Sequence, residues 1–334
     1  MRIQSPYLLF LGDEPSSAMA KTARGLAHWR PELCLAQCRV DGRGADLGLP
    51  ELSPRAAAAE GAKTMVIGVA NVGGFIPDSW TGSIIGALEA GLDVASGLHT
   101  RLTDLETVRD AAERSGRALY DVRHPRQSFP PGSGEPRPGL RLLTVGTDCA
   151  VGKMYTALAL ERAMKNRGMK ADFRASGQTG ILIAGEGISV DAVVSDFVSG
   201  AAEWLSPANE ADHWDLVEGQ GSLFHPAYAG VTLGLIHGSQ PDALVVCHQA
   251  KRRHLHGFPR FATPSIRECM ERHVEAARLT NPEVICVGVS IDTSSMEEEA
   301  ATEYLDELED MLGVPCVDPL KTGVQAVVDR LEDL

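Results

Sequence analysis

The segment from Arg141 to Lys153 constrains the fold of this chain more than any other feature of its sequence. Arg141 to Val145 has the apolar pattern of a buried strand, and the loop that follows, Gly146 to Met154, reads GTDCAVGKM. An apolar-periodic helix begins directly after the loop. Strand, glycine-bounded loop and helix in this order predict a P-loop rather than a turn that binds nothing. Its backbone N–H groups would converge on an anion, with Lys153 as a point charge.

Two features of this loop depart from the standard pattern. Five residues separate Gly146 from Gly152, where the usual P-loop has four. Met154 stands where a Ser or Thr normally offers its hydroxyl to Mg²⁺. A thioether is a poor ligand for that hard cation. The loop is therefore expected to bind phosphates without a metal, and nucleotide hydrolysis is in doubt.

The rest of the sequence alternates strand-like and helix-like segments on both sides of a proline-rich stretch. Residues 124–139, HPRQSFPPGSGEPRPG, have five prolines, three glycines and no hydrophobic periodicity, which predicts a linker. Before it, apolar runs such as Tyr7–Leu11 alternate with amphipathic stretches such as Lys21–Trp29. The same alternation of apolar and amphipathic segments is found after it. We expect an α/β fold with two domains: a Rossmann-like parallel sheet in residues 1–123 and a P-loop NTPase-like domain in residues 140–334.

Composition narrows the classes of partner. A formal net charge of -14 argues against a protein that grips nucleic-acid backbones, so we expect small-molecule substrates and no nucleic acid. The seven cysteines sit mostly in apolar runs such as Val245-Val246-Cys247, which suits reduced thiols. No apolar run approaches the ~18 residues of a membrane span, and no signal peptide is recognisable, so we expect no membrane association and a cytoplasmic protein.

The longer loop resembles that of dethiobiotin synthetase. Gly146-Thr147-Asp148 and Val151-Gly152-Lys153 repeat the pattern of that enzyme, in which a Thr follows the lysine. There, a Glu-Gly turn after a later strand helps to hold Mg²⁺, and Glu218-Gly219 is similar to it. This resemblance implies an ancestry in ATP-dependent ligation. A Mg-ATP-dependent ligase or kinase is therefore one alternative function, and a non-catalytic nucleotide- or CoA-binding protein is another.

Five segments of the chain occur in a characteristic order: Ile67 to Gly74, Gly97-Leu98-His99, Gly146 to Met154, Ser176 to Gly180, and Glu218 to Pro226. With these segments the chain resembles, across nearly its whole length, the D-glutamate N-acetyltransferase family, a two-domain group long described as a domain of unknown function. The resemblance implies an acyltransferase that moves an acetyl group from acetyl-CoA to the amine of D-glutamate, a step of D-amino acid catabolism.

Acetyl-CoA would then be the co-substrate that the P-loop anchors. Its 3′-phospho-ADP portion offers phosphates but no reactive γ-phosphoryl group, which fits a loop without the magnesium hydroxyl. The residues expected to bind it are those of the loop: Thr147, Asp148, Cys149, Ala150, Val151, Gly152, Lys153 and Met154.

Two residues are candidates for the base that takes the proton from the substrate amine. Glu218 follows a predicted strand, and the carboxyl ends of parallel strands are where such folds place ligands. It could instead only orient its loop. His225 could serve because an imidazole titrates near neutral pH, or it could be a turn histidine.

The remaining candidates would hold the substrate or shape the loop. A dicarboxylate needs cations and hydrogen-bond donors, and five residues near the motifs could supply them: Arg174, Gln178, Thr179, Gln220 and Ser222. Asp148 could cap the following helix or bind a residual cation. Cys149 could carry an acetyl group or only pack in the loop. Base rates for enzymes of this size favour a homo-oligomer.

Overall fold

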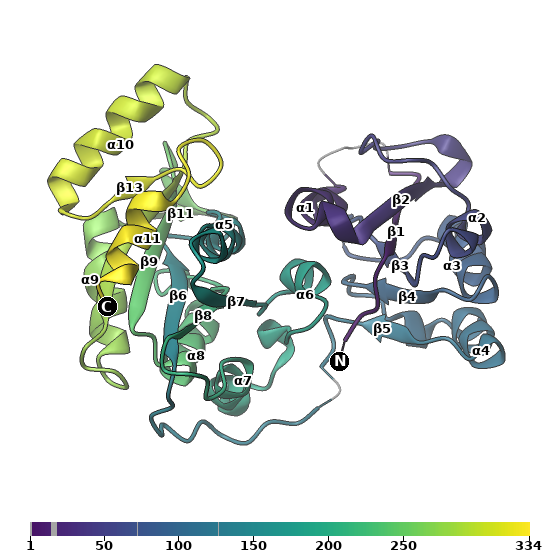
Figure 1. Cartoon of the computed structure of the whole chain (residues 1–334), viewed down its shortest axis with the longest axis horizontal. Helices are drawn as coiled ribbons and strands as arrows, with labels where there is room; N and C mark the ends of the chain where they lie inside the picture. The colour runs from purple at the N-terminus through teal and green to yellow at the C-terminus, as the bar shows by residue number, and fades with distance from the viewer. Residues whose placement is uncertain (1, 15–18, 72, 126) are drawn as a thin grey trace. The chain divides into compact units, whose positions relative to one another are not determined.

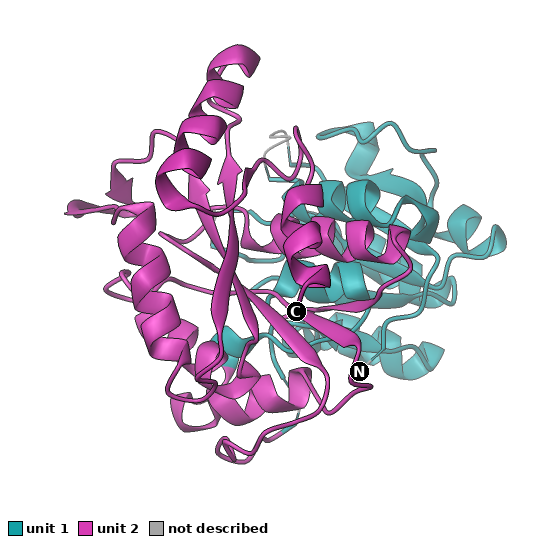
Figure 2. Cartoon of the chain, turned by 60° about the vertical axis from the view of Figure 1, so that its left-hand side comes forward, with its two compact units in different colours: residues 1–127, 177–192 teal, residues 128–176, 193–334 magenta. Residues whose placement is uncertain are grey.

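The computed structural model describes residues 2–14, 19–71, 73–125 and 127–334, so Val72 and Arg126 of the segments above lie outside the description. The chain divides into two compact units (Figure 2). Unit 1 contains residues 1–127 and 177–192, and unit 2 contains residues 128–176 and 193–334.

Unit 1 is built on a parallel sheet (Figure 1). Within the described residues its strand order is β2-β1-β3-β4-β5, which is a doubly wound order. The bounds are β1 Tyr7–Gly12, β2 Cys34–Arg39, β3 Thr64–Ile67, β4 Asp93–Ser96 and β5 Leu119–Asp121. β1, β3 and β4, the three inner strands, are almost entirely buried, as parallel strands covered on both faces must be.

The helices of unit 1 come from two separate parts of the sequence. Its amino-terminal helices are α1 Lys21–Trp29, α2 Pro54–Ala59, α3 Asp78–Glu89 and α4 Glu106–Ser115. A fifth, α6 (Gln178–Ala184), belongs to the same unit and contacts α1. Its neighbour Gly185 accepts a hydrogen bond from the backbone N–H of Ile3 at 2.8 Å. Residues 177–192 therefore complete unit 1, although we expected a continuous second domain from residue 140.

Unit 2 contains a larger parallel sheet of order β13-β12-β9-β6-β8-β7 within the described residues. The bounds are β6 Leu140–Gly146, β7 Lys170–Arg174, β8 His213–Val217, β9 Ala243–Gln249, β12 Ile285–Asp292 and β13 Cys316–Val317. β6 lies between β8 and β9. The loop that follows β6 is thus flanked by the carboxyl ends of two neighbouring strands, where such sheets bind ligands.

Helices cover both faces of this sheet (Figure 1). They are α5 Lys153–Asn166, α7 Val198–Leu205, α8 Ala229–Ser239, α9 Ile266–Ala277, α10 Glu298–Leu312 and α11 Gln325–Glu332. α5 connects β6 to β7, and α8 connects β8 to β9, so the two connections cross the sheet in opposite directions. Because such connections are right-handed, the two helices lie on opposite faces of the sheet. A small antiparallel hairpin of β10 (His254–Leu255) and β11 (Phe258–Ala262) follows β9. The α/β fold class predicted from the sequence is confirmed.

The proline-rich stretch is docked on unit 2 from residue 128 onward. Arg137 donates to the carbonyl oxygen of Gly238 at 2.8 Å and to that of Ser206 at 3.0 Å. Ser133 donates its backbone N–H to the Glu203 carboxylate at 2.7 Å. This part of the predicted linker is therefore fixed by hydrogen bonds. Among the described residues, no helix combines the length and apolar character needed to cross a membrane.

Candidate functional site

The loop between β6 and α5 has a curled backbone. β6 ends at Gly146 and α5 begins at Lys153. Between them Ala150 and Gly152 have φ values of 52° and 94°, in the left-handed region. Left-handed residues in such a turn direct successive N–H groups toward one centre, which can bind an anion. The loop therefore places backbone donors at the amino end of a 14-residue helix.

Arg252 holds this loop from outside. Its guanidinium donates to the Asp148 carboxylate at 2.7 Å and to the carbonyl oxygens of Cys149 and Ala150 at 2.8 and 3.3 Å. In a trans peptide the C=O and the next N–H point in opposite directions. Carbonyls directed at Arg252 therefore leave the following N–H groups directed away from it, toward the loop centre.

Asp148 is explained by the same contacts. Besides Arg252, its carboxylate accepts the backbone N–H of His256 at 2.7 Å and that of Cys149 at 2.6 Å. It does not cap α5, which has no side-chain cap at its amino end. The negative charge in the loop is thus neutralised by an arginine from the segment after β9, and it does not oppose a bound anion.

Lys153 points into the loop. Its buried ammonium group donates to the carbonyl oxygen of Asp148 at 2.7 Å. Burial lowers the pKa of Lys153, because a charge removed from water is costly. A phosphate at the centre of the loop would offset that cost by pairing with the ammonium.

The hydroxyl groups near the loop have partners inside the protein. Thr147 bonds to Nδ1 of His248 at 2.9 Å, and burial lowers the pKa of His248 to about 4, so this ring is neutral. Thr156 bonds to the carbonyl oxygen of Gly152 at 3.0 Å and to Ser290 at 2.7 Å. It does not replace the hydroxyl that is missing at Met154, whose side chain lines the cavity described below.

Glu218 follows β8 and is 4% exposed. Its carboxylate accepts the backbone N–H of Ser176 at 3.0 Å, and Ser176 Oγ donates to the Glu218 carbonyl at 2.5 Å. A Cβ at the next residue, Gly219, would lie 1.7 Å from the carbonyl oxygen of Thr144, so only glycine fits. This close approach brings Glu218 beside the phosphate loop.

Gln220 and Ser222 differ in what they can reach. The Gln220 amide donates to Ser176 Oγ at 3.1 Å, and its side chain lines the cavity. Ser222 is fully buried, and its hydroxyl accepts the backbone N–H of Phe224 at 3.3 Å. Gln220 is therefore available to a ligand, whereas Ser222 stabilises its own turn.

His225 is enclosed by aromatic rings and hydrogen-bonded on both sides. Nδ1 accepts the backbone N–H of Ala227 at 3.2 Å, and Nε2 lies 3.5 Å from the carbonyl oxygen of His256. The ring stacks on Tyr228 and meets the edge of Phe258. These contacts fix the proton on Nε2 and occupy the lone pair of Nδ1, so the geometry does not favour His225 as a base.

Asp148, Cys149 and His225 bring ligand-type atoms within 4.8 Å of one another, and no other such group is found among the described residues. A metal there would need an oxygen of Asp148 and a lone pair of His225, both of which already accept hydrogen bonds. Burial raises the pKa of the Cys149 thiol, which also makes it a weak nucleophile.

The other substrate-binding candidates are distributed over both units. Arg174, at the end of β7, donates to the buried carboxylate of Asp215 at 2.7 Å, so its charge already has a partner. Gln178 and Thr179 are the first residues of α6, which belongs to unit 1. The Thr179 hydroxyl lies 3.2 Å from that of Thr22.

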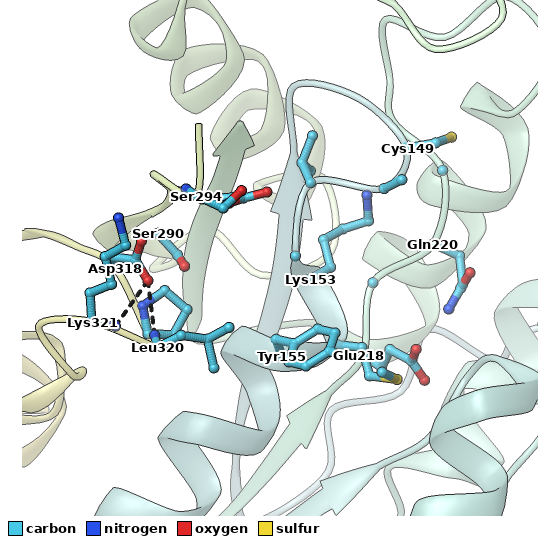
Figure 3. A pocket seen from close by; sticks show the side chains of 18 residues that line it. Cys149, Lys153, Tyr155, Glu218, Gln220, Ser290, Ser294, Asp318, Leu320 and Lys321 are labelled. Atoms are coloured by element: carbon cyan, nitrogen blue, oxygen red, sulfur yellow. Dashed lines mark hydrogen bonds between the residues drawn. The ribbon is translucent and has the colours of Figure 1, made fainter. Parts of the chain in front are cut away.

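A cavity of about 590 Å³ in unit 2 extends along the loop. Figure 3 shows Cys149, Glu218 and Gln220 toward one side of it and Asp318, Leu320 and Lys321 toward the other, with Lys153 between them. The lining therefore has two parts, one on each side of Lys153, which we call the Glu218 arm and the Lys321 arm of the cavity. The lining includes residues that the motifs did not indicate, namely Tyr155, Ser290, Asp292, Ser294 and Asp318 to Lys321. Tyr155 lies in the first turn of α5, whereas the others lie on β12 or follow β12 and β13, far from the loop in the sequence.

The chain matches two family models. The description of one is "Domain of unknown function (DUF1611_C) P-loop domain", and it matches residues 130–328. The description of the other is "Domain of unknown function (DUF1611_N) Rossmann-like domain", and it matches residues 35–125. Together they cover more than half of the chain.

Three relatives are similar over almost the full length. A D-glutamate N-acetyltransferase of Pseudoalteromonas sp is 50% identical over 99% of this chain and 100% of that protein. A D-glutamate N-acetyltransferase of Tritonibacter scottomollicae is 50% identical over 98% of this chain and 99% of that one. The crystal structure of a DUF1611 family protein from Anabaena variabilis is 32% identical, with a TM-score of 0.86 over 99% of this chain and 100% of that chain.

Proposed function

The chain belongs to the DUF1611 family, and from that premise we propose that it moves an acetyl group from acetyl-CoA to the amine of D-glutamate. Two relatives that are 50% identical over nearly the whole chain are named D-glutamate N-acetyltransferase, and the chain is an acyltransferase of this group. The products would be N-acetyl-D-glutamate and CoA. The observation that supports this choice of donor is that the residues lining the cavity lie on both sides of Lys153 (Figure 3).

The shape of that cavity supports CoA over ATP. In ATP the phosphates form one end of the ligand, so a site for it needs room on only one side of the loop. In acetyl-CoA the diphosphate is internal, with adenosine on one side and the thioester arm on the other. Lys153 lies between two arms of the cavity, which suits an internal diphosphate (Figure 3). Met154 removes the hydroxyl on which a Mg-ATP site depends, so we propose transfer without a metal.

Glu218 is the base that we propose. The acceptor amine is protonated at neutral pH and must lose a proton before its lone pair can attack the acetyl carbonyl. The C–N bond then forms, the C–S bond breaks, and CoA leaves as a thiolate that takes up a proton. Glu218 lies in the arm of the cavity toward which the thioester would extend, and Gln220 in the same arm could donate to a substrate oxygen.

For the acceptor, we keep Gln178 and Thr179 as proposed binding residues. Gln178 lies two residues after Ser176 in the chain, and the backbone N–H of Ser176 donates to the Glu218 carboxylate. Arg174 would have to share its charge between the acceptor and Asp215, and Ser222 would have to exchange the hydrogen bond within its own turn.

A free-thiol release assay tests the reaction. Acetyl-CoA would be mixed with the protein and either D- or L-glutamate, with EDTA present and nucleotide absent. We expect thiol release with D-glutamate and little with L-glutamate. No release with either isomer, followed by turnover with Mg-ATP, would contradict the proposal and return the chain to the ligases.

Glu218→Gln separates the role of base from that of a structural acceptor. The amide oxygen of Gln can still accept the N–H of Ser176, but the amide cannot take a proton. We expect kcat to fall by roughly 10²–10⁴-fold while the affinity for CoA, measured by calorimetry, stays unchanged. Near-normal turnover in this variant would exclude the base role.

A further inference from the structure

The cavity holds a second lysine besides the one in the P-loop. Among the described residues that line it, the cationic side chains are Lys153 and Lys321. They lie on different elements: Lys153 begins α5, and Lys321 is in the loop between β13 and α11. Figure 3 shows Lys321 on the side of the cavity away from Glu218. None of the sequence motifs indicated this lysine.

Asp318 makes the loop that carries Lys321 rigid. One carboxylate oxygen accepts the N–H and the hydroxyl of Thr293 at 3.0 and 2.6 Å. The other accepts the backbone N–H groups of Leu320 and Lys321 at 2.9 and 3.2 Å. The backbone of Lys321 is therefore fixed to the end of β12, and the Asp318 carboxylate is engaged with other donors.

The ammonium group of Lys321 has neutral partners. It donates to the carbonyl oxygens of Thr293 and Met296 at 3.1 and 3.4 Å, and it takes part in no ion pair within the described parts of the chain. Asp292, another acid of the lining, accepts the backbone N–H of Ser294 and the amide of Gln249. A positive charge thus stands at the edge of the cavity without a carboxylate to neutralise it.

The surface beside this charge is apolar. Leu320 is 59% exposed, and it lines the cavity together with Pro319 and Tyr155. An exposed leucine next to an aromatic ring offers a surface on which a heteroaromatic ring can pack. The Lys321 arm of the cavity therefore combines an apolar surface with one cation at its edge.

We propose that Lys321 binds the 3′-phosphate of the donor and that the adenine ring packs against Leu320. This rests on the proposed use of acetyl-CoA. That donor carries anionic groups at two places, the internal diphosphate and the 3′-phosphate on the ribose, and the cavity has one lysine for each. An ammonium group serves as a point charge for phosphate without fixed geometry. The arrangement also orients the donor, with adenosine toward Lys321 and the thioester toward Glu218.

The test compares acetyl-CoA with acetyl-3′-dephospho-CoA in the whole protein. We expect kcat/KM of the unaltered protein to be roughly tenfold or more higher with acetyl-CoA than with the dephospho donor, because the dephospho donor lacks one charge-assisted contact. The difference should lie in KM and not in kcat. Lys321→Met should remove most of this preference and leave turnover of the dephospho donor nearly unchanged. Lys321→Arg should restore part of it.

Lys251→Met is the matched control. Like Lys321, Lys251 donates to a carbonyl oxygen of the segment between β12 and α10, that of Ser295 at 3.1 Å, but it does not line the cavity. This variant should keep the preference of the unaltered protein. Equal use of both donors by the unaltered protein, or an undiminished preference in Lys321→Met, would overturn the assignment and leave the acetyl transfer intact. Failure of both donors would instead overturn the proposed reaction, and the assignment with it.

Discussion

Arg252 shows how a single residue can set the shape of a binding loop that it does not belong to. Arg252→Met would leave the Asp148 carboxylate, which is fully buried, without its cation and free the carbonyls of Cys149 and Ala150. Breaking such a pair usually costs several kcal/mol. We expect the KM for acetyl-CoA to rise roughly 10- to 100-fold, with a smaller change in kcat because Arg252 contacts no reacting atom. Steady-state kinetics would measure both.

Arg260→Met is the control for this prediction. Arg260 is an exposed residue of β11 in the same hairpin region, and its replacement should leave KM unchanged. An unchanged KM in Arg252→Met as well would show that the loop holds its shape without the arginine.

The sequence could indicate the phosphate loop but not the arginine behind it. Gly152, Lys153 and the preceding strand form a local pattern that can be recognised directly. Asp148 and Arg252 are 104 residues apart, so no spacing rule connects them. The available signal was indirect: an acid inside an anion-binding loop requires a cation from elsewhere.

Two buried histidines predict a loss of stability in acid. Burial lowers the pKa values of His248 and His273 from 6.5 to about 4. Between pH 6.5 and pH 4 these histidines are protonated in the unfolded chain but not in the folded one. The free energy of unfolding is therefore highest above pH 6.5 and decreases as the pH falls toward 4. Each residue can contribute roughly 3 kcal/mol to this loss. Melting temperatures recorded from pH 7 to pH 4 would show it.

His273→Gln isolates one of the two contributions. Gln can still donate to the carbonyl of Cys269, which the ring contacts at 2.7 Å, but it does not titrate. We expect a smaller fall in melting temperature between pH 6.5 and pH 4 than in the unaltered protein. In His254→Gln, a change at an exposed position, the melting temperature should fall with pH as much as in the unaltered protein. Parallel curves for both variants would contradict the prediction.

At the scale of elements, the long periodic segments could be predicted and the short ones could not. Lys21–Trp29 was expected as a helix and is α1 with the same bounds. α6 was missed because its seven residues lie between Gly177 and Gly185, which favour a turn. Burial of Ile181 to Ile183 in unit 1 stabilises it instead, a tertiary effect that local propensity does not contain. β13 has two residues and was missed for its length.

α8 packs against α7 through a glycine. A Cβ at Gly238 would lie 2.1 Å from the carbonyl oxygen of Ser199 and 2.7 Å from the Cβ of Ala202. Gly238→Ala should therefore destabilise the protein by about 1–3 kcal/mol, because the helices must move apart. Gly230→Ala on the same helix meets nothing within 4 Å and should be neutral or stabilising by about 0.5 kcal/mol. Urea unfolding would measure the free energy of unfolding of both variants, and equal changes in the two would contradict the role of Gly238 in packing.

At the scale of the whole molecule, the chain passes between the two units at three places: after residues 127, 176 and 192. The proline-rich stretch marked the first of these. Nothing in the sequence marked the other two, because residues 177–192 follow a strand of unit 2 and were expected to stay with it. The division into two domains could be predicted, but the return of the chain to unit 1 could not.

Fragments of unit 2 should therefore differ according to whether they contain residues 177–192. A continuous fragment of residues 128–334 would expose Ile181, Leu182 and Ile183, which unit 1 buries, and we expect it to aggregate. A fragment in which a flexible Gly/Ser linker replaces 177–192 should stay monodisperse and bind CoA, since the cavity lies within unit 2. Light scattering and calorimetry would distinguish the two, and equal solubility would contradict the expectation.

The three passages also limit how this protein could have arisen from separate genes. End-to-end fusion of a Rossmann-like gene and a P-loop gene gives one junction, whereas the division seen here needs residues 177–192 to be placed inside the P-loop gene as well. A single recombination event that exchanged either half with another protein would leave α6 facing a surface that did not evolve with it. We therefore expect substitutions in α1 and α6, which contact each other, to be correlated across descendants of this gene.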